Sequence, residues 1–455
     1  MTTQNNKKTH TYLFKSMITA FKRYIIPALI LTLLIGKTAI AQDRTITLDE
    51  ALKLGLANSN VVKLSKAKID QAVSQYNQAK DGVLPTGKVS LTYDRAEIPA
   101  NTLDFGNSKI NLPKGADAYL GIASLNEVIF GGNKLKYAQQ STELLAQASR
   151  VDAETDKDGV AYDIIVQYYN LYKVLQSIKV VQQNLGTIDQ QIKQAQRFFD
   201  QGIVTKNDVL RFQLQRSNIE LNGIDLETNR KIVNYNLNIL LGLPEGTQLA
   251  VNEVDTDKTV GPLSAYLDTA MAERAELRSL DIRSKVAETN IKNIRANTSP
   301  TLAASAGLYY VDIAANPIPQ SGQYITPVTI GLTFGWNFST LWTNKNKVAE
   351  AKIQSDEVTL NKAITINNVK REVNQDYQNY LMAADKIKLL QTSIDQAGEN
   401  NKILDSKYRS NIASATDRAD AETLLYQAQI NLELAKADAG LAYYTLLKST
   451  GKLNK

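Results

Sequence analysis

The stretch Gly202-Ile203-Val204-Thr205-Lys206-Asn207-Asp208-Val209-Leu210 recurs 209 residues later as Asn411-Ile412-Ala413-Ser414-Ala415-Thr416-Asp417-Arg418-Ala419. Without a gap, the same offset places Phe199 over Tyr408 and Gly242 over Gly451. A chain that repeats itself over half its length contains two copies of one structural unit. Each copy of the stretch separates two long helical patterns. The sequence therefore predicts two helical hairpins, with these stretches as their turns.

The segments on either side of the turns have an apolar period close to seven residues. In the first half, a long helix is expected over 133–200 and a returning helix over 205–241. In the second half, the corresponding helices are expected over 344–407 and 414–450. At 1.5 Å per residue the first of these helices would be roughly 100 Å long. Such a helix must pack along others of similar length, as in a coiled coil.

Two strands and a shorter helix precede each hairpin. In the first repeat, residues 42–242, a helix is predicted over 48–82 and strands over about 86–94 and 119–130. Residues 243–262 form a connection with a short strand candidate at Leu249 to Val251. In the second repeat, residues 263–455, the corresponding helix ends near Asn297 and the strands lie at about 301–311 and 327–339. Each half thus reads as helix, two strands and helical hairpin.

The first and fourth predicted strands show a period of two, whereas the alternation over 119–130 is poor. In the fourth strand one face is wholly apolar and the other is small and polar. An apolar face about ten residues long with aromatics at one end is typical of a strand that spans a bilayer in a barrel. Four strands cannot close a barrel, and open edges are not tolerated in lipid, so three copies supplying twelve strands are expected. The predicted lipid-facing residues are Val89, Leu91, Tyr93, Val328, Ile330, Leu332, Phe334, Trp336 and Phe338.

The first 41 residues differ from the rest of the chain. Lysines and an arginine precede an apolar run from Tyr24 to Ile35, and Ala39-Ile40-Ala41 has the form of a cleavage site. This pattern predicts a secretory signal peptide over 1–41. The segment holds six of the 52 Lys and Arg residues and no acid, so the mature chain would carry as many basic residues as its 46 acids. A nucleic-acid partner is therefore not expected.

The chain has no Cys, and its single His, His10, lies in the predicted signal peptide. The mature chain therefore lacks Cys and His nucleophiles, a His general base and Cys or His metal ligands. Paired carboxylates could still serve a glycosidase, but that chemistry needs a concave pocket, which long paired helices do not offer. The expectation is a protein without enzymatic activity, cofactor or metal.

Several short motifs occur in the same order in this chain and in a known family. They are Leu48-Asp49-Glu50-Ala51-Leu52, Leu84-Pro85, Ile129-Phe130-Gly131-Gly132, the turn at 202–210 and Leu240-Leu241-Gly242-Leu243-Pro244. Together with the internal repeat, they make the whole mature chain resemble the TolC-like outer membrane efflux family. The resemblance implies an α+β membrane protein, a homotrimer whose twelve-stranded β-barrel continues into a periplasmic α-helical barrel.

The resemblance also implies function. A member of this family would be a passive export channel in the outer membrane of a Gram-negative bacterium, extending into the periplasm. It would work with a periplasmic adaptor protein and an inner membrane pump in efflux or type I secretion. The two hairpin turns would be the tips at which the adaptor docks. The tip residues are Gly202, Ile203, Val204, Thr205, Asp208, Asn411, Ile412, Ala413 and Ser414.

The family's entrance constriction matches Asp417 and Asp420. Three residues apart on a helix, these carboxylates face the same way and, in a trimer, would form two rings that attract cations. Thr205 with Asp208 and Ser414 with Asp417 also read as capping boxes, so Asp417 either gates the channel or only starts its helix. The chain departs from the family at Asn411, where Gly is common, and at Ala413, where a basic residue helps to hold the entrance closed.

A second class of function is also consistent with the sequence. A periplasmic coiled-coil scaffold, with the strands in a small soluble domain, would share the helical pattern but have no channel activity. Such a protein would be extractable without detergent, whereas a channel would be recovered only from the outer membrane.

Overall fold

The computed structural model describes residues 44–97, 99, 101–111, 114–252, 258–315 and 324–453. The predicted signal peptide, Pro113 and the loop with Pro317 and Pro319 lie outside the described residues. The chain divides into two compact units. Of the described residues, 44–54, 166–252 and 392–437 belong to the first unit, and the others belong to the second.

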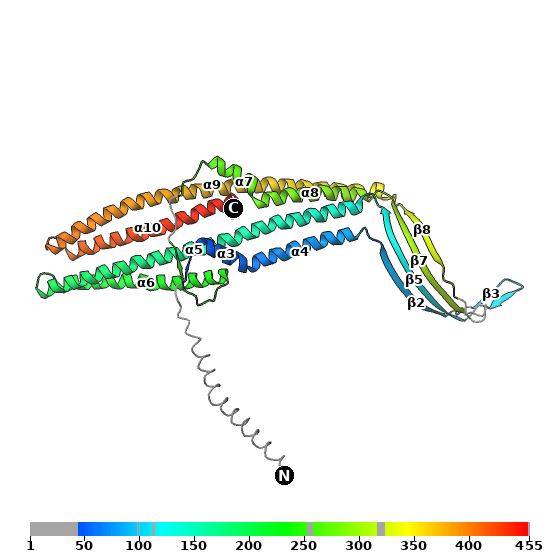
Figure 1. Cartoon of the computed structure of the whole chain (residues 1–455), viewed down its shortest axis with the longest axis horizontal. Helices are drawn as coiled ribbons and strands as arrows, with labels where there is room; N and C mark the ends of the chain where they lie inside the picture. Colours follow the sequence, from blue (N-terminus) through cyan, green and yellow to red (C-terminus); the bar gives the residue numbers. More distant parts are fainter. Residues whose placement is uncertain are drawn as a thin grey trace, which may run out of the picture. The chain divides into compact units, whose positions relative to one another are not determined.

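Four long helices run through the chain (Figure 1). They are α5 (Lys134–Asp200), α6 (Lys206–Leu241), α9 (Thr340–Arg409) and α10 (Ala415–Ser449). Gly159 lies inside α5 without interrupting it, because surrounding residues supply the helical hydrogen bonds and packing. Helix α9 begins four residues earlier than the sequence predicted, where Thr340 donates its N–H to the Asn337 carbonyl at 3.1 Å.

The two shorter helices predicted from the sequence are each broken in two. The predicted helix 48–82 is α3 (Leu48–Asn58) followed by α4 (Asn60–Asp81). Ser59 separates them with a ψ of 125°, and its hydroxyl accepts a hydrogen bond from the Val62 N–H at 3.4 Å. The helix predicted to end near Asn297 is α7 (Leu263–Glu273) and α8 (Ala275–Ala296), separated at Arg274. Ser readily caps a new helix, which a reading of apolar period alone does not detect.

In the second unit, four antiparallel strands form one sheet in the order β2, β5, β7, β8 (Figure 1). Their bounds are Thr86–Glu97, Gly115–Phe130, Thr301–Ala315 and Val328–Gly335. The first three extend a few residues beyond the predicted ends. A separate hairpin of β3 (Thr102–Asp104) and β4 (Lys109–Asn111) was not expected from the sequence. Among the described residues, β2 and β8 pair on one side only and form the two edges of the sheet.

The prediction that Trp336 and Phe338 belong to a strand is wrong. Strand β8 ends at Gly335, which pairs with Thr301, the first residue of β7. Pro300 precedes Thr301 and has no N–H to donate, so no partner strand continues beyond Gly335. The side chains of Trp336 and Phe338 are nevertheless exposed, and they lie in the short connection before α9.

The register places the remaining predicted lipid-facing residues on one face of the sheet. Val89 is opposite Ala123, Ala123 is opposite Leu308, and Leu308 is opposite Val328. Directly opposed residues point to the same side of a sheet. The predicted residues within the strands are all exposed: Val89, Leu91, Tyr93, Val328, Ile330, Leu332 and Phe334. Their contact with lipid stays a prediction.

The first unit contains a small parallel sheet and the ends of the long hairpins. Strand β1 (Arg44–Ile46), absent from the sequence prediction, pairs with β6 (Leu249–Val251). The Tyr168 hydroxyl donates to the Ile46 carbonyl at 3.2 Å and so attaches β1 to α5. Among the described residues, every helix is too short or too polar to be a candidate membrane span.

Candidate functional site at the two hairpin turns

The two turns of the repeat have the same backbone structure. In the first, Gly202 has a φ of 74°, and the Ile203 N–H is donated to the Phe198 carbonyl at 2.8 Å. In the second, Asn411 has a φ of 54°, and the Ile412 N–H is donated to the Lys407 carbonyl at 2.8 Å. Both are Schellman-type helix ends, which need a residue in the left-handed region. Asn tolerates this region better than other side chains do, which explains the departure from Gly.

Both returning helices begin with the capping boxes expected from the sequence. The Asp208 carboxylate accepts from the N–H and the hydroxyl of Thr205, each at 2.8 Å. The Asp417 carboxylate accepts from the N–H of Ser414 at 3.1 Å and from its hydroxyl at 2.8 Å. The hydrogen bonds from the hydroxyl and N–H of Ser414 hold the pKa of Asp417 below its usual value. In this protomer, the geometry of Asp417 is that of a helix cap.

Asp420 lies in a different environment from Asp417. Its Oδ1 is 3.2 Å from a guanidinium nitrogen of Arg211 in α6, and its side chain is 66% exposed. Arg211 occupies the same position in the first repeat that Asp420 occupies in the second. The sequence prediction placed Asp417 and Asp420 in one group, but the structure gives them separate partners on separate helices.

Below the turns, an apolar core joins the two hairpins. Its buried residues come from α5, α6, α9 and α10, and include Ile188, Phe212 and Tyr408. The Tyr408 ring lies 5.9 Å from Phe198 and 5.8 Å from Phe212, centroid to centroid. Ala413 and Val204 are partly buried at the turns, whereas Ile203 and Ile412 are exposed. The turns thus combine an apolar core with two exposed isoleucines.

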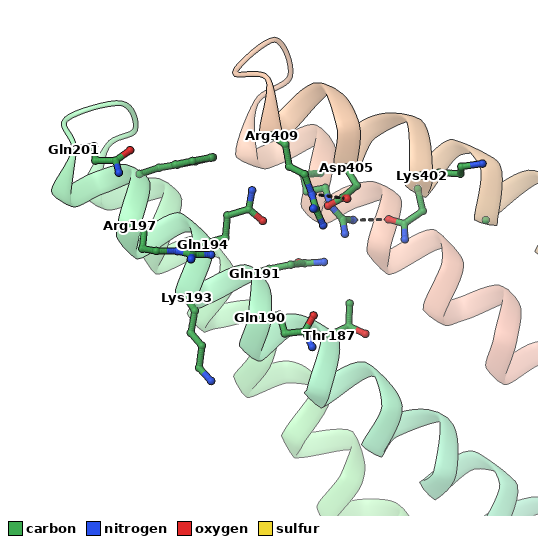
Figure 2. A pocket seen from close by; sticks show the side chains of 14 residues that line it. Thr187, Gln190, Gln191, Lys193, Gln194, Arg197, Gln201, Lys402, Asp405 and Arg409 are labelled. Carbon is green, nitrogen blue, oxygen red and sulfur yellow. Dashed lines mark hydrogen bonds and ion pairs between the residues drawn. The ribbon is translucent and has the colours of Figure 1, made fainter.

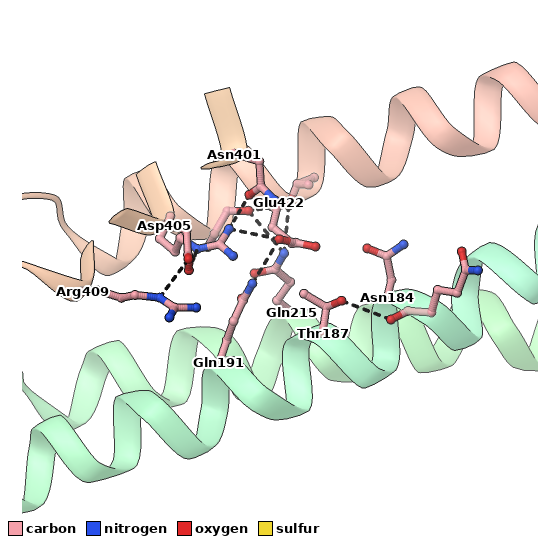
Figure 3. A network of polar contacts seen from close by, with 12 residues as sticks. Asn184, Thr187, Gln191, Gln215, Asn401, Asp405, Arg409 and Glu422 are labelled. Carbon is pink, nitrogen blue, oxygen red and sulfur yellow. Dashed lines mark hydrogen bonds and ion pairs between the residues drawn. The ribbon is translucent and has the colours of Figure 1, made fainter. Parts of the chain in front are cut away.

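A buried ionic network lies next to this core, and sequence reasoning missed it. The Arg418 side chain is only 5% exposed, and its guanidinium lies 3.0 Å from Glu422 and 3.2 Å from Asp405. Arg418 also donates to the Asn401 side chain. The Glu422 side chain is 4% exposed and accepts from Gln191 of α5 at 3.1 Å. Figure 3 shows these side chains converging from α5, α9 and α10.

A signal for this network was present in the repeat. Arg418 corresponds to Val209 of the first copy, and both residues are buried. A charged residue at a position that is apolar in the other repeat indicates a buried ion pair, because an unpaired buried charge is very costly. The network is attached to the first hairpin through Gln191, so it holds the two hairpins together with polar contacts.

Beside the network lies an open groove of about 700 Å³ between α5 and α9. Figure 2 shows side chains of both helices lining it. Arg409 lies 2.9 Å from Asp405, the one acidic residue of the lining. Gln191 Oε1 is buried and accepts no hydrogen bond from any described residue. The basic lining residues are Lys193, Arg197, Lys402, Arg409 and Arg418.

Further polar contacts join the two hairpins. Gln215 of α6 donates to the Thr423 hydroxyl at 3.1 Å and to the Ala419 carbonyl at 3.3 Å. Asn184 of α5 donates to Gln429 of α10 at 3.2 Å. Polar and ionic contacts of this kind are directional and can be exchanged for water or for other partners.

Comparison with known proteins places the chain in a family. The sequence profile of the outer membrane efflux protein family matches residues 51–243 and 266–452. The chain is 22% identical over 443 residues to the outer membrane efflux protein BepC of Brucella suis, covering 95% of this chain and 91% of BepC. It is 21% identical to the outer membrane protein TolC of Escherichia coli, covering 95% of this chain and 87% of TolC.

Solved structures share the fold. The outer membrane protein VceC of Vibrio cholerae superposes with a TM-score of 0.74 at 14% identity, covering 89% of this chain and 96% of VceC. The CmeC outer membrane channel of Campylobacter jejuni superposes with a TM-score of 0.75 at 16% identity, covering 89% and 86% of the two chains. The chain belongs to the outer membrane efflux protein family and is an outer membrane channel of the TolC-like fold.

Proposed function

We propose that three copies of this chain form the outer membrane duct of a tripartite efflux or type I secretion system. In this proposal the duct is passive: a periplasmic adaptor connects it to an inner membrane pump, and the pump selects the substrate. The family match and the names of the relatives as efflux proteins support the proposal. The observation that carries it is the four-stranded sheet with an exposed apolar face and two unpaired edges.

The edges of the sheet argue for association with further copies. A strand in lipid has no water to satisfy its free N–H and C=O groups, so an unpaired edge is very unfavourable there. In a closed ring, β8 of one copy would lie antiparallel to β2 of the next copy, and three copies would give twelve strands. The exposed apolar residues of β2 have odd numbers, and those of β8 have even numbers. Any closed pairing must therefore place odd β2 residues opposite even β8 residues.

The helical tips would perform docking and gating in this duct. The exposed Ile203 and Ile412 and the groove beside them offer the adaptor a surface with apolar and basic parts. Asp420 would supply the carboxylate ring of the constriction. The buried Arg418 network would hold the hairpins in the closed arrangement, in place of the basic residue that Ala413 does not provide.

Introduced cysteines test the assembly directly, because the natural chain has none. Ser90→Cys in β2 is combined with Thr329→Cys, Gly331→Cys or Thr333→Cys in β8, all on the face opposite to the apolar one. Oxidation of the correct pair links each copy to both neighbours, so a covalent trimer is expected on denaturing gels. Three strand spacings separate β2 from β8 inside one chain, roughly 14 Å, which is too far for a disulfide.

Ser90→Cys combined with Ile330→Cys or Leu332→Cys is the matched control, since these side chains point to the other face and are expected to remain unlinked. Exclusively monomeric products from every pair in the outer membrane would refute the trimer. Recovery of the protein without detergent would favour the periplasmic scaffold. A photoreactive residue at Ile203 or Ile412 would test docking, with capture of the adaptor as the expected result.

A further inference from the structure

A repeated basic motif follows the strands in both halves of the chain. Asn133-Lys134-Leu135-Lys136 opens α5, and Asn344-Lys345-Asn346-Lys347 lies in the second turn of α9. Both helices begin at the same end of the sheet (Figure 1). The second motif follows an exposed aromatic group made of Trp336, Phe338 and Trp342. We call the four lysines and these three aromatic residues the collar.

The lysines of the collar are available for a ligand. All four side chains belong to exposed residues, and none forms an ion pair with another described residue. Lys134 and Lys136 lie in the first turn of α5, which contains no acidic residue. A positive charge there opposes the helix dipole and destabilises the helix by about 0.3–1 kcal/mol. The two lysines therefore do not stabilise α5, and an interaction outside the helix must account for their position.

The aromatic residues show where this surface lies relative to lipid. The Phe338 ring is 6.4 Å from Trp336 and 5.8 Å from Trp342, and the Trp336 indole N–H donates to the Thr298 carbonyl at 3.0 Å. The indole is thus held in place while its ring stays exposed. The group directly follows Phe334, the last apolar residue of the exposed sheet face. Aromatic residues at the end of a lipid-facing strand lie at the level of the headgroups.

The geometry points to binding of anionic phospholipids of the periplasmic leaflet, whose phosphate groups lie on the lysines while the aromatic rings contact the glycerol and upper acyl region. Lys345 follows Trp342 by three residues, or about 4.5 Å along the helix. The headgroup region is roughly 5–8 Å thick on each side of the hydrocarbon core, so the amines fall within it. The unpaired positive charges select a negative headgroup, and continuity with the apolar sheet face selects a lipid.

Native mass spectrometry of the full-length protein tests this inference. The protein is equilibrated in detergent micelles that contain phosphatidylglycerol or phosphatidylcholine, and bound lipids are counted. The wild type is expected to retain phosphatidylglycerol in preference. Lys134→Gln/Lys136→Gln and Lys345→Gln/Lys347→Gln should each lower the affinity for phosphatidylglycerol about 25-fold, at about fivefold per lysine. The variant in which all four lysines are replaced by Gln, called the four-lysine variant, should bind both lipids equally.

Lys66→Gln/Lys68→Gln is the matched control, because these two exposed lysines of α4 have the same spacing but lie about 20 Å along the helix from the sheet. It should keep the wild-type preference, and no variant should unfold below the wild-type temperature in lipid-free detergent. An unchanged preference in the four-lysine variant would overturn the inference. So would an equal loss in the control, or complete displacement of the lipid by millimolar inorganic phosphate.

Discussion

Arg211 and Asp420 form an ion pair at 3.2 Å although they are the same position of the two repeats. The internal repeat thus brings equivalent residues of opposite charge together between α6 and α10. Asp417, which the sequence grouped with Asp420, is instead held by Ser414 at the start of its own helix. This separation makes the two carboxylates distinguishable by mutation.

The first prediction concerns the cation selectivity of the channel. Asp420→Ala should weaken block by multivalent cations in planar bilayers, because three carboxylates are lost from the constriction of the proposed trimer. Exposed ionic contacts contribute about 0.2–1 kcal/mol each, so the loss of three should weaken block roughly tenfold. Arg211→Gln should act in the opposite direction, since it leaves Asp420 without its cation.

Asp208→Ala is the control for this measurement, because Asp208 is bound to Thr205 at its helix start. It should leave the cation block almost unchanged. Equal effects of Asp208→Ala and Asp420→Ala would remove Asp420 from the constriction.

The second prediction concerns the buried network around Arg418. Arg418→Ala leaves Glu422 buried without its cation, a change that typically costs about 3–5 kcal/mol. The first turns of α10 should then exchange their amide hydrogens faster, and the channel should open more often. The double variant Arg418→Leu/Glu422→Leu should be less harmful than Arg418→Ala, because it removes both charges.

Arg216→Ala is the matched control for a merely exposed arginine, since Arg216 is partly exposed and lies 2.7 Å from Asp189. Its effect on hydrogen exchange and on opening should be small. If Arg418→Ala opened no more often than Arg216→Ala, the network would have no specific role in closure.

The third prediction compares the two turns. Asn411→Gly should keep the second turn intact, whereas Asn411→Ala should destabilise it by up to about 1–2 kcal/mol, because Ala lacks the short polar side chain that lets Asn occupy the left-handed region at a φ of 54°. Gly202→Ala should cost a similar amount in the first turn, whose φ is 74°. Thermal unfolding in detergent measures both, with Ser410→Ala as the neighbouring control. A destabilising Asn411→Gly would show that the Asn side chain has a further partner.

The sequence predicted features that depend on local or periodic signals. The repeat located both turns, and Thr205 and Ser414 marked the capping boxes because a hydroxyl three residues before a carboxylate is a local pattern. The break at Ser59 and the end of β8 at Gly335 were not predicted. The first depends on one residue inside a continuing apolar period, and the second on where the partner strand begins.

The sequence also did not predict which residues the charged side chains would pair with. Arg418 stands at a helical core position, but which carboxylates it meets depends on how α5, α9 and α10 pack. The same holds for the pairing of Arg211 with Asp420. The period of a helical pattern predicts which face of the helix a residue lies on, but not which other helix packs against that face. Comparison of the two repeats at one position, as for Val209 and Arg418, is the sequence signal that could have indicated the network.

The fourth prediction concerns pH and arises from a cluster in the second unit. Arg274, at the break between α7 and α8, donates to Glu372 of α9 at 2.9 Å and to the Ser449 carbonyl of α10 at 3.0 Å. One turn after Glu372, Asp376 is half-buried beside the same helix end. Burial, and then the negative charge of Glu372, raise the pKa of Asp376 to about 6, although Ser449, Lys448 and Arg274 act to lower it.

The folded state therefore binds this proton more tightly than the unfolded chain does. The resulting stabilisation is complete below the pKa of an unfolded aspartate and is lost as the pH rises through about 6. At pH 7.5, Asp376→Asn should raise the unfolding temperature, because it adds about 1 kcal/mol to the free energy of unfolding once screening by solvent is allowed for. At pH 4.5 it should have little effect. Asp356→Asn, an exposed carboxylate of the same helix, should behave like the wild type at both pH values. A gain from Asp376→Asn of the same size at both pH values would show that its proton is not the cause.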